Sequence, residues 1–462
     1  MVHVPPGITL VVGLGISGRA ICRHLARQGV SFMVADTREE PPEMAAFHSA
    51  HPDVVVHCGP LEVLDIDAVE EVVVSPGVDP HHPTLAPLAA QMNPRTGEPR
   101  LVGEMALFVR AASAPIAAIT GSNAKSSVTT LLGQMAQVSG VNAAVGGNLG
   151  TPALDLLAQQ PDAELFILEL SSFQLETTPR LGAAVAAFLN LSEDHLDRHG
   201  DMQGYCRAKQ AIFHGAQHAV VNADDPMTFP NEPVATLTRF GNQAPGSRDF
   251  GLAIEQGQLT LMKGKAPWLA ADQLAMVGQH HYVNGLAALA MGDALGFDQT
   301  AMCEALKGFK GLPHRSELIV ELDGVKWVND SKGTNVGATL AAIEGISASL
   351  TGRLILLAGG VGKGADFSPL AAPLSASARC VILFGQDALR LDEALADHVE
   401  TRLVEGLEHA MQEAYALAKP GDCVLLSPAC ASLDQFVNYQ ARGDAFRQWV
   451  EQKARFSSEA TS

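Results

Sequence analysis

The sequence lacks the cysteine spacings of a metal site or of a disulfide framework. Its 7 cysteines are scattered over 462 residues, without a CxxC pair or a Cys/His ligand pattern. We therefore expect buried free thiols in a reducing cytoplasm.

Long apolar runs are missing as well. The stretch from Leu181 to Leu191 is far shorter than the roughly 20 apolar residues that span a bilayer. No lysine or arginine precedes the first apolar run, and glycines follow it, so a strand and turn is a better interpretation than a signal peptide. We expect no membrane insertion and a cytoplasmic location.

Positive charge is scarce, because 31 Lys and Arg residues stand against 50 Asp and Glu residues and the formal net charge is −19. Such a surface repels phosphate backbones and anionic lipids, so no nucleic acid partner is expected. Anionic ligands must then bind in local sites. We expect the chain to act as a monomer.

Aromatic residues make up only 5% of the chain, whereas 47% of the residues are apolar. Small aliphatic side chains at this level suit parallel sheets covered by helices. The length exceeds what one hydrophobic core supports, and three domains of roughly 100 to 200 residues are expected.

Short β-branched runs alternate with helix-like segments, which indicates repeated βαβ units. The predicted strands are Ile8–Val12, Ser31–Ala35, Val72–Val74, Ile116–Thr120, Leu165–Leu170, Val185–Leu189, Leu354–Ala358, Val381–Phe384 and Val424–Leu426. Polar, turn-rich stretches at Gln91–Arg100 and Gly308–Arg315 interrupt the pattern, so we predict domains at residues 1–102, 103–311 and 312–462. Segment Asn231–Trp268 is expected to form a small antiparallel addition to the central domain.

Gly13, Gly15 and Gly18 form a GxGxxG turn between a predicted strand and a helix, and Asp36 ends the next strand. This pattern brings backbone close to a diphosphate at a helix N-terminus. An NAD-type dinucleotide, another diphosphate such as a UDP-sugar, and a purely structural tight turn all satisfy it. A second loop, which begins at Ser75, would approach the same ligand.

The segment Gly121–Ser127 follows a strand and opens a helix. It offers backbone N–H groups for phosphates, Lys125 for the β/γ oxygens and the Ser126 hydroxyl for Mg²⁺. Because Ile119 and Ala124 depart from GxxxxGK[ST], an ordinary β-to-α turn is an alternative. Unless φ of Ala124 is negative, we expect its methyl group to shift or strain the loop slightly while ATP binding survives.

Two candidate metal or catalytic residues follow at strand ends. Glu169 ends the strand in LELSSFQLE, and His195 lies in NLSEDHLDRHG, just past the next strand. Ligands of parallel sheets bind at the carboxyl ends of strands, so both indicate metal binding and catalysis beside the loop. Solvated loop residues are the alternative. Lys209, in YCRAKQAIF, is by itself typical of an exposed helix lysine.

Basic and hydroxyl side chains follow three strands in the last third of the chain. Asp330, Lys332 and Thr334 lie in VNDSKGTN, Lys363 in LLAGGVGKGADF, and Ser432 in SPACASLDQF. Lysines at strand ends suit the carboxylates of an acidic amino acid, and ordinary surface lysines are the alternative.

The motifs TGSNAKSS, ELSSFQLE, NLSEDHLDRHG and YxxAK occur in the order and approximate spacing of the Mur ligase family, which the chain resembles over nearly its whole length. The resemblance implies an α/β fold with a Rossmann-like N-terminal domain, a P-loop ATPase-like central domain and a Rossmann-like C-terminal domain. It also implies ATP-dependent amide bond formation through an acyl phosphate, with ATP and Mg²⁺ as cofactors. DSKGTN and SPACASLDQF resemble members that add D-glutamate to UDP-N-acetylmuramoyl-L-alanine in peptidoglycan synthesis.

The resemblance implies a role for each matching residue. Catalysis is implied for Lys125, His195 and Lys209, and Mg²⁺ binding for Ser126, Glu169, His195 and Lys209, the last as an anionic carbamate. ATP contacts are implied for Gly121, Ser122, Asn123, Ala124, Lys125, Ser126, Ser127, Asn284, Arg315 and Asp330. Contacts to the UDP-linked substrate are implied for Ser17, Asp36, Thr37, Ser75 and Asn148. Contacts to D-glutamate are implied for Lys332, Thr334, Lys363, Ser432, Leu433 and Tyr439.

Further departures from the family pattern concern two binding regions. His281 replaces an asparagine near the expected adenine contact, and Val361 and Tyr439 replace an acidic residue and a phenylalanine near the amino-acid site. Three rival functions are alternatives. A folylpolyglutamate synthase would lack the Gly13 to Gly18 turn, and the others are an NAD-dependent oxidoreductase and a nucleotide-regulated binding protein without catalysis.

Overall fold

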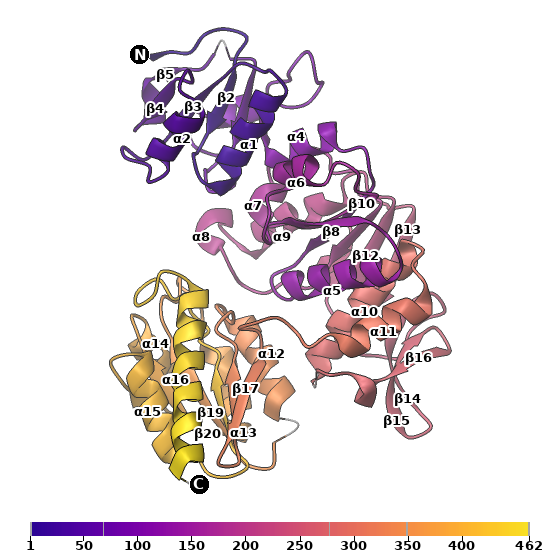
Figure 1. Cartoon of the computed structure of the whole chain (residues 1–462), viewed down its shortest axis with the longest axis vertical. Coiled ribbons are helices and arrows are strands. Elements are labelled where there is room, and N and C mark those ends of the chain that lie inside the picture. Colours follow the sequence, from indigo (N-terminus) through magenta and orange to yellow (C-terminus); the bar gives the residue numbers. More distant parts are fainter. Residues whose placement is uncertain (1, 68, 277, 348–349, 461–462) are drawn as a thin grey trace.

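The computed structural model describes residues 2–67, 69–276, 278–347 and 350–460, whose strands form three large sheets and a two-stranded one. The large sheets follow one another along the chain, and Figure 1 shows three successive bodies with the termini at opposite ends. Each predicted strand overlaps an observed one. The α/β fold of three tandem domains is therefore confirmed. Within the described ranges, no helix has the length and apolar character needed to cross a membrane.

The first sheet consists of parallel strands. Their order is β4 (Val56–Cys58), β3 (Phe32–Asp36), β2 (Thr9–Val12), β6 (Glu71–Val74) and β7 (Leu101–Gly103). The helices of this domain are α1 (Ile16–Arg27), α2 (Met44–Ala50) and α3 (Ala86–Ala89), and β1 (Val2–His3) pairs with β5 (Leu64–Asp65). The buried strand β2 runs into the glycine turn. A Cβ on Gly18 would lie 1.8 Å from the carbonyl oxygen of Gly13, so only glycine fits there.

The central sheet carries the phosphate loop. Its strand order is β16 (Ala266–Ala270), β15 (Gln258–Lys263), β14 (Phe250–Glu255), β13 (Thr236–Phe240), β12 (His218–Asn222), β11 (Val185–Phe188), β8 (Ile116–Thr120), β10 (Leu165–Glu169) and β9 (Ala143–Gly147). Strands β14 to β16 pair antiparallel and the others pair in parallel. The expected antiparallel addition is thus an extension of the main sheet.

Helices cover both faces of the central sheet. One face packs against α5 (Lys125–Val138), α10 (Gln279–Ala294) and α11 (Gln299–Gly308) in one apolar cluster. The opposite face packs against α4 (Glu104–Ala111) and α6 (Ala153–Gln159), in a cluster that also contains side chains of α1. The short helices α7 (Ser172–Leu175) and α8 (Leu196–His199) and the helix α9 (Met202–Gln210) lie near the carboxyl ends of the strands. The first domain therefore shares a hydrophobic core with the central one.

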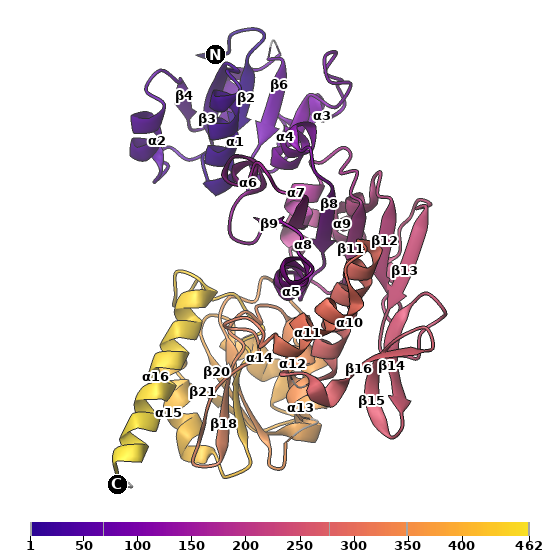
Figure 2. The same ribbon diagram turned by 45° about the vertical axis from the view of Figure 1, so that its right-hand side comes forward.

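The third sheet has the order β17 (Glu317–Leu322), β18 (Val325–Asn329), β22 (Cys423–Leu426), β19 (Leu354–Gly359), β20 (Ala378–Phe384) and β21 (Thr401–Leu403). Strand β17 pairs antiparallel at one edge, and the other strands pair in parallel. The helices are α12 (Val336–Ser347), α13 (Ala371–Ser377), α14 (Ala388–Leu395), α15 (Leu407–Leu417) and α16 (Tyr439–Ala460). They lie on both faces of the sheet, and α16 leads to the C-terminus (Figure 2).

We predict that Gly18→Ala destabilises the protein strongly and that Gly15→Ala, whose added Cβ meets no atom within 4 Å, does not. Forcing a methyl group against backbone costs about 1 to 3 kcal/mol, because the backbone cannot move aside as a side chain can. Thermal unfolding of the two full-length variants measures the difference. Equal melting temperatures would contradict the close approach of Gly18 to Gly13.

Candidate active site

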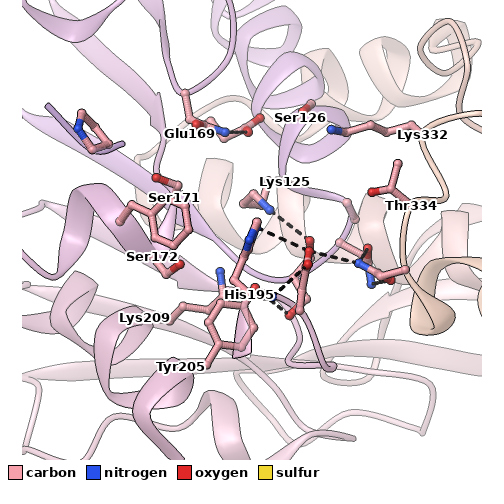
Figure 3. A pocket seen from close by; sticks show the side chains of 18 of the residues that line it. Lys125, Ser126, Glu169, Ser171, Ser172, His195, Tyr205, Lys209, Lys332 and Thr334 are labelled. Atoms are coloured by element: carbon pink, nitrogen blue, oxygen red, sulfur yellow. Dashed lines mark hydrogen bonds and ion pairs between the residues drawn. The ribbon is translucent and has the colours of Figure 1, made fainter. Parts of the chain in front are cut away.

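A cavity of about 350 Å³ lies where the three domains meet. Its walls combine residues of the phosphate loop, of the strand ends of the central sheet and of the third domain, with a single loop residue from the first domain. The lining residues are Pro76, Ser122, Asn123, Ala124, Lys125, Ser126, Asn148, Glu169, Ser171, Ser172, Phe173, Asp194, His195, Tyr205, Lys209, Arg315, Lys332, Thr334, Asn335 and Lys363. Figure 3 shows Lys332 and Thr334 entering from the side opposite Ser171 and Ser172.

The phosphate loop joins β8 to α5 and is held from the neighbouring strand. The N–H of Asn123 donates to Oδ1 of Asn190 at 2.8 Å, and Nδ2 of Asn190 donates back to the Asn123 carbonyl at 3.2 Å. The N-terminus of α5 opens at Lys125, beside this cavity. Free N–H groups at such a terminus favour an anion. Asn190 was not predicted from the sequence, although it is the first residue of NLSEDHLDRHG and lies two residues past the end of β11.

Ala124 caps the start of α5 in the left-handed conformation, with φ 64°. The expectation of strain depended on the sign of this angle, and the angle is positive. A residue with a Cβ pays about 1 kcal/mol or more for this conformation because the Cβ approaches backbone oxygen. The loop keeps its shape in spite of this cost, since Asn190 holds it at Asn123.

Two lysines converge on one backbone carbonyl in the floor of the cavity. Nζ of Lys125 and Nζ of Lys209 each donate to the Gly121 carbonyl at 2.8 Å. Lys209 is only 1% exposed, so its interpretation as an exposed helix lysine is wrong. Burial, reinforced by the charge of Lys125, lowers the pKa of Lys209 well below its ordinary value. Burial also lowers the pKa of Lys125.

Glu169 places a carboxylate at the end of β10, where it is buried. Its Oε1 accepts from Nδ2 of Asn148 at 2.8 Å, whereas its buried Oε2 has no hydrogen-bond partner. An unpartnered carboxylate oxygen on a cavity wall suits a hard cation such as Mg²⁺. The Ser126 hydroxyl accepts from Nη2 of Arg315 at 2.7 Å. The described residues contain no group of three His, Cys, Asp or Glu side chains that could hold a metal ion without other ligands. Oxygen atoms of phosphate or water would therefore have to complete the coordination shell of a metal ion bound here.

Asp194 connects the central and third domains and was missed in the sequence. Its carboxylate lies 3.6 Å from Nε2 of His195 and 3.4 Å from Nζ of Lys363, and it accepts from Nδ2 of Asn335 at 3.5 Å. Burial alone would raise the pKa of Asp194, but His195 and Lys363 bring it below its ordinary value. Burial lowers the pKa of His195. The signal was present, because Asp194 directly precedes His195 in NLSEDHLDRHG.

Three of the six residues predicted for D-glutamate, Lys332, Thr334 and Lys363, line the central cavity. Burial, then Arg315 and Lys125, lowers the pKa of Lys332 to about 8. The ring of Tyr439, another of the six, lies 4.2 Å from Nζ of Lys332, behind the cavity wall. The remaining two are the buried Ser432 and Leu433, which is 70% exposed.

A second cavity, of about 130 Å³, adjoins the phosphate loop and contains the other predicted ATP contacts except Gly121, which is among the lining residues of neither cavity. Ser127, Asn284 and Asp330 line it, and Asn123, Ala124, Arg315 and Lys332 line both cavities. The rings of His280 and His281 also line it, with centroids 3.9 Å apart. Burial lowers the pKa of His281 to about 3, so the His281 ring in this wall is uncharged at physiological pH.

The residues predicted for the UDP-linked substrate lie mainly away from the cavity. Asn148 lines it, whereas Ser17, Thr37 and Ser75 belong to the first domain, Ser17 in the first turn of α1 and the other two directly after β3 and β6. Asp36 accepts from the N–H of Leu14 at 2.7 Å and pairs with Arg38 at 2.8 Å. Pro76, next to Ser75, is the residue of this domain that reaches the cavity wall. A ligand that spans both places must be extended.

Comparison with known proteins identifies the family. Three family models match: the Mur ligase MurD-like N-terminal domain over residues 8–96, the Mur ligase middle domain over 119–292 and the Mur ligase glutamate ligase domain over 314–430. The chain is 62% identical over 450 residues to a UDP-N-acetylmuramoylalanine–D-glutamate ligase of Chromohalobacter salexigens, covering 97% of this chain and 98% of the relative. It is 49% identical over 446 residues to the ligase of the same name from Pseudomonas aeruginosa, covering 96% and 98%. The structure of a UDP-N-acetylmuramate-alanine ligase from Thermotoga maritima shares the fold, with a TM-score of 0.57, 16% identity and coverage of 96% and 99%. This chain therefore belongs to the Mur ligase family.

Proposed function

We propose that this protein is an ATP-dependent ligase that joins D-glutamate to UDP-N-acetylmuramoyl-L-alanine in peptidoglycan precursor synthesis. The convergence of Lys125, Lys209 and Glu169 with Lys332 and Lys363 on one cavity carries the proposal. The first three suit phosphoryl transfer, and the last two suit the carboxylates of an acidic amino acid. Relatives with 62% and 49% identity over almost the whole chain are named for this reaction.

The reaction needs two steps, because a carboxylate is a poor acyl donor. The terminal alanine carboxylate attacks the γ-phosphorus of ATP, which gives an acyl phosphate and releases ADP. The amine of D-glutamate then attacks the acyl carbon and displaces phosphate, with loss of a proton from the amine. Lys125 and the N-terminus of α5 lie where they would offset the charge of the transferring phosphoryl group.

We propose Mg²⁺ as the cofactor and Glu169, Ser126, His195 and a modified Lys209 as the side chains around it. The unpartnered Oε2 of Glu169 supports this assignment. A bound Mg²⁺ would neutralise charge on the phosphoryl oxygens. Arg315, which donates to the Ser126 hydroxyl at 2.7 Å, would have to release it.

Lys209 is proposed to work as a carbamate. Its lowered pKa favours the uncharged amine, which is the form that is nucleophilic toward carbon dioxide. The carbamate is an anion, so it would be attracted by Lys125, whereas a charged lysine would be repelled. The change from a positive to a negative charge on the Lys209 side chain would explain why two lysines lie beside one carbonyl in the floor of the cavity.

The domains are proposed to divide the substrates. Residues 1–102 would bind the UDP moiety through Ser17, Asp36, Thr37 and Ser75, residues 103–311 would bind ATP, and residues 312–462 would bind D-glutamate. The cavity between them would exclude water from the acyl phosphate, which hydrolyses if exposed. We propose that a monomer acts in the cytoplasm, where ATP is available.

Phosphate release by the full-length protein is predicted to require ATP, UDP-N-acetylmuramoyl-L-alanine and D-glutamate together. The acyl phosphate would form only on the muramoyl acceptor. The lysines of the third domain would bind the carboxylates of one stereoisomer of glutamate, the D form. A colorimetric phosphate assay over a panel of amino acids measures the requirement. Equal release with L-glutamate, or with either substrate omitted, would refute the proposed reaction.

Lys209→Ala is predicted to lower kcat by at least about 10²-fold, the typical cost of losing a preorganised electrostatic group. A short-chain carboxylic acid added to this variant should restore part of the activity, because its carboxylate can enter the space left by the carbamate. Steady-state rates with and without acetate measure this. Lys265→Ala, at an exposed lysine, is the control and should behave as wild type. A Lys209→Ala variant that acetate leaves inactive would argue against the carbamate.

Ala124→Gly is predicted to stabilise the central domain by up to about 1 kcal/mol, because glycine adopts positive φ without steric cost. Ala301→Gly, within α11, is the matched control and should destabilise by about 0.5 to 1 kcal/mol. Thermal melting of both variants without ligand compares them. If the melting temperatures of both variants change in the same direction, Ala124 is not strained.

A further inference from the structure

Arg198, the third residue of α8, connects the central domain to the first domain. Its Nη2 donates to the carbonyl of Val78 at 2.8 Å, and its Nε lies 3.7 Å from Oδ1 of Asp79. Both partners belong to the loop that begins at Ser75. The side chain of Arg198 is only 13% exposed, so it sits within the contact between the domains.

The other side of the guanidinium faces the central domain. Nη2 also pairs with Oε1 of Glu176, whose side chain is 9% exposed, and the guanidinium lies over the ring of Phe173, 4.9 Å from its centroid. The ring of Phe173 is in turn 4.9 Å from the ring of His195. Helices α7 and α8, which carry these side chains, lie side by side in both views (Figures 1 and 2). A continuous chain of contacts thus runs from the loop of the first domain to His195.

The same loop reaches the reaction cavity. Pro76 lines the cavity together with Phe173 and His195, and Val78 is two residues further along the chain. A shift of the Val78 carbonyl would therefore move Pro76 relative to the phosphate loop. An extended substrate anchored in the first domain passes this point before its carboxylate reaches Lys125.

The hydrogen bond between Arg198 and the Val78 carbonyl differs from another contact between these two domains. On the α1 side, Arg23 makes a two-point contact with Asp155 at 2.5 and 3.1 Å, away from the cavity lining. That contact fixes the domains to each other. Arg198 instead holds a backbone carbonyl of a loop against the helix that follows His195.

We propose that Arg198 is a positioning residue that sets the Ser75 to Val78 loop at a fixed distance from His195, so that the carboxylate of the UDP-linked acceptor reaches the phosphate loop. This inference rests on the proposed function. It does not make Arg198 a ligand of ATP or of the amino acid. Changing Arg198 should therefore weaken the binding of the UDP-linked acceptor or slow its reaction, and should leave the binding of ATP and of the amino acid unaffected.

Arg198→Lys is the decisive variant, because it keeps a positive charge beside the buried Glu176 but lacks the planar guanidinium that covers the Phe173 ring while Nη2 donates to the Val78 carbonyl. We expect KM for UDP-N-acetylmuramoyl-L-alanine to rise about tenfold, the effect of losing one charge-assisted hydrogen bond, while KM for ATP changes less than about twofold. Arg198→Ala should show a larger change in the same KM. Arg207→Ala, at an exposed arginine of α9, is the matched control and should leave every constant unchanged.

Initial rates of the full-length proteins, with each substrate varied in turn, and thermal melting without ligand provide the test. A rise confined to the acceptor KM, with the melting temperature of Arg198→Lys kept, supports the positioning role. An unchanged acceptor KM, or a parallel rise in all three KM values with a lower melting temperature, overturns it and leaves a purely structural ion pair. Absence of turnover by the wild-type protein would instead overturn the proposed function.

Discussion

The cavity concentrates positive charge that its own carboxylates do not balance. Lys125 and Lys209 share the Gly121 carbonyl, and Lys332 faces them from the third domain. Asp194 and Glu169 are the acidic side chains among the lining residues. Such a site is stable in an open cavity only if some lysines give up their protons or if anions enter. The lowered pKa values of Lys125, Lys209 and Lys332 favour the first response, and nucleotide phosphates and substrate carboxylates would supply the second.

The parallel sheets bring these charges together. Strands β8, β10 and β11 lie side by side, so the phosphate loop, Glu169 and the His195 segment leave the sheet at one edge. The third domain presents its own strand ends, which carry Lys332 after β18 and Lys363 after β19, toward that edge. Ligands bind at the carboxyl ends of parallel strands for this reason. Two such edges that face each other form the cavity, and neither domain would form it alone.

Much of this arrangement could be predicted from the sequence, because strands, glycine turns and motif spacing are local signals. The strand positions, the loop at Lys125 and the edge position of Glu169 follow from hydrophobic runs and what ends them. The burial of Lys209 could not be derived from its helix alone, since its Nζ contacts Thr120 at the end of β8 and Gly121 of the phosphate loop as well as the Tyr205 ring of its own helix. The contacts of Asp194 with Asn335 and Lys363 could not be derived for the same reason, because these partners lie in a different domain, although the position of Asp194 beside His195 was a signal.

Contacts between domains are where sequence reasoning is weakest and where function depends most on geometry. The Asn335 amide reaches both Asn123 of the phosphate loop and Asp194, across a sequence separation of 212 and 141 residues. A change in the angle between the central and third domains would break these hydrogen bonds before it disturbed either sheet, because these two domains have separate cores. The reaction cavity is therefore less stable than the domains that form it. Binding of substrates that touch two domains at once would raise the population of an arrangement in which these contacts are made, and the reacting groups would meet only then.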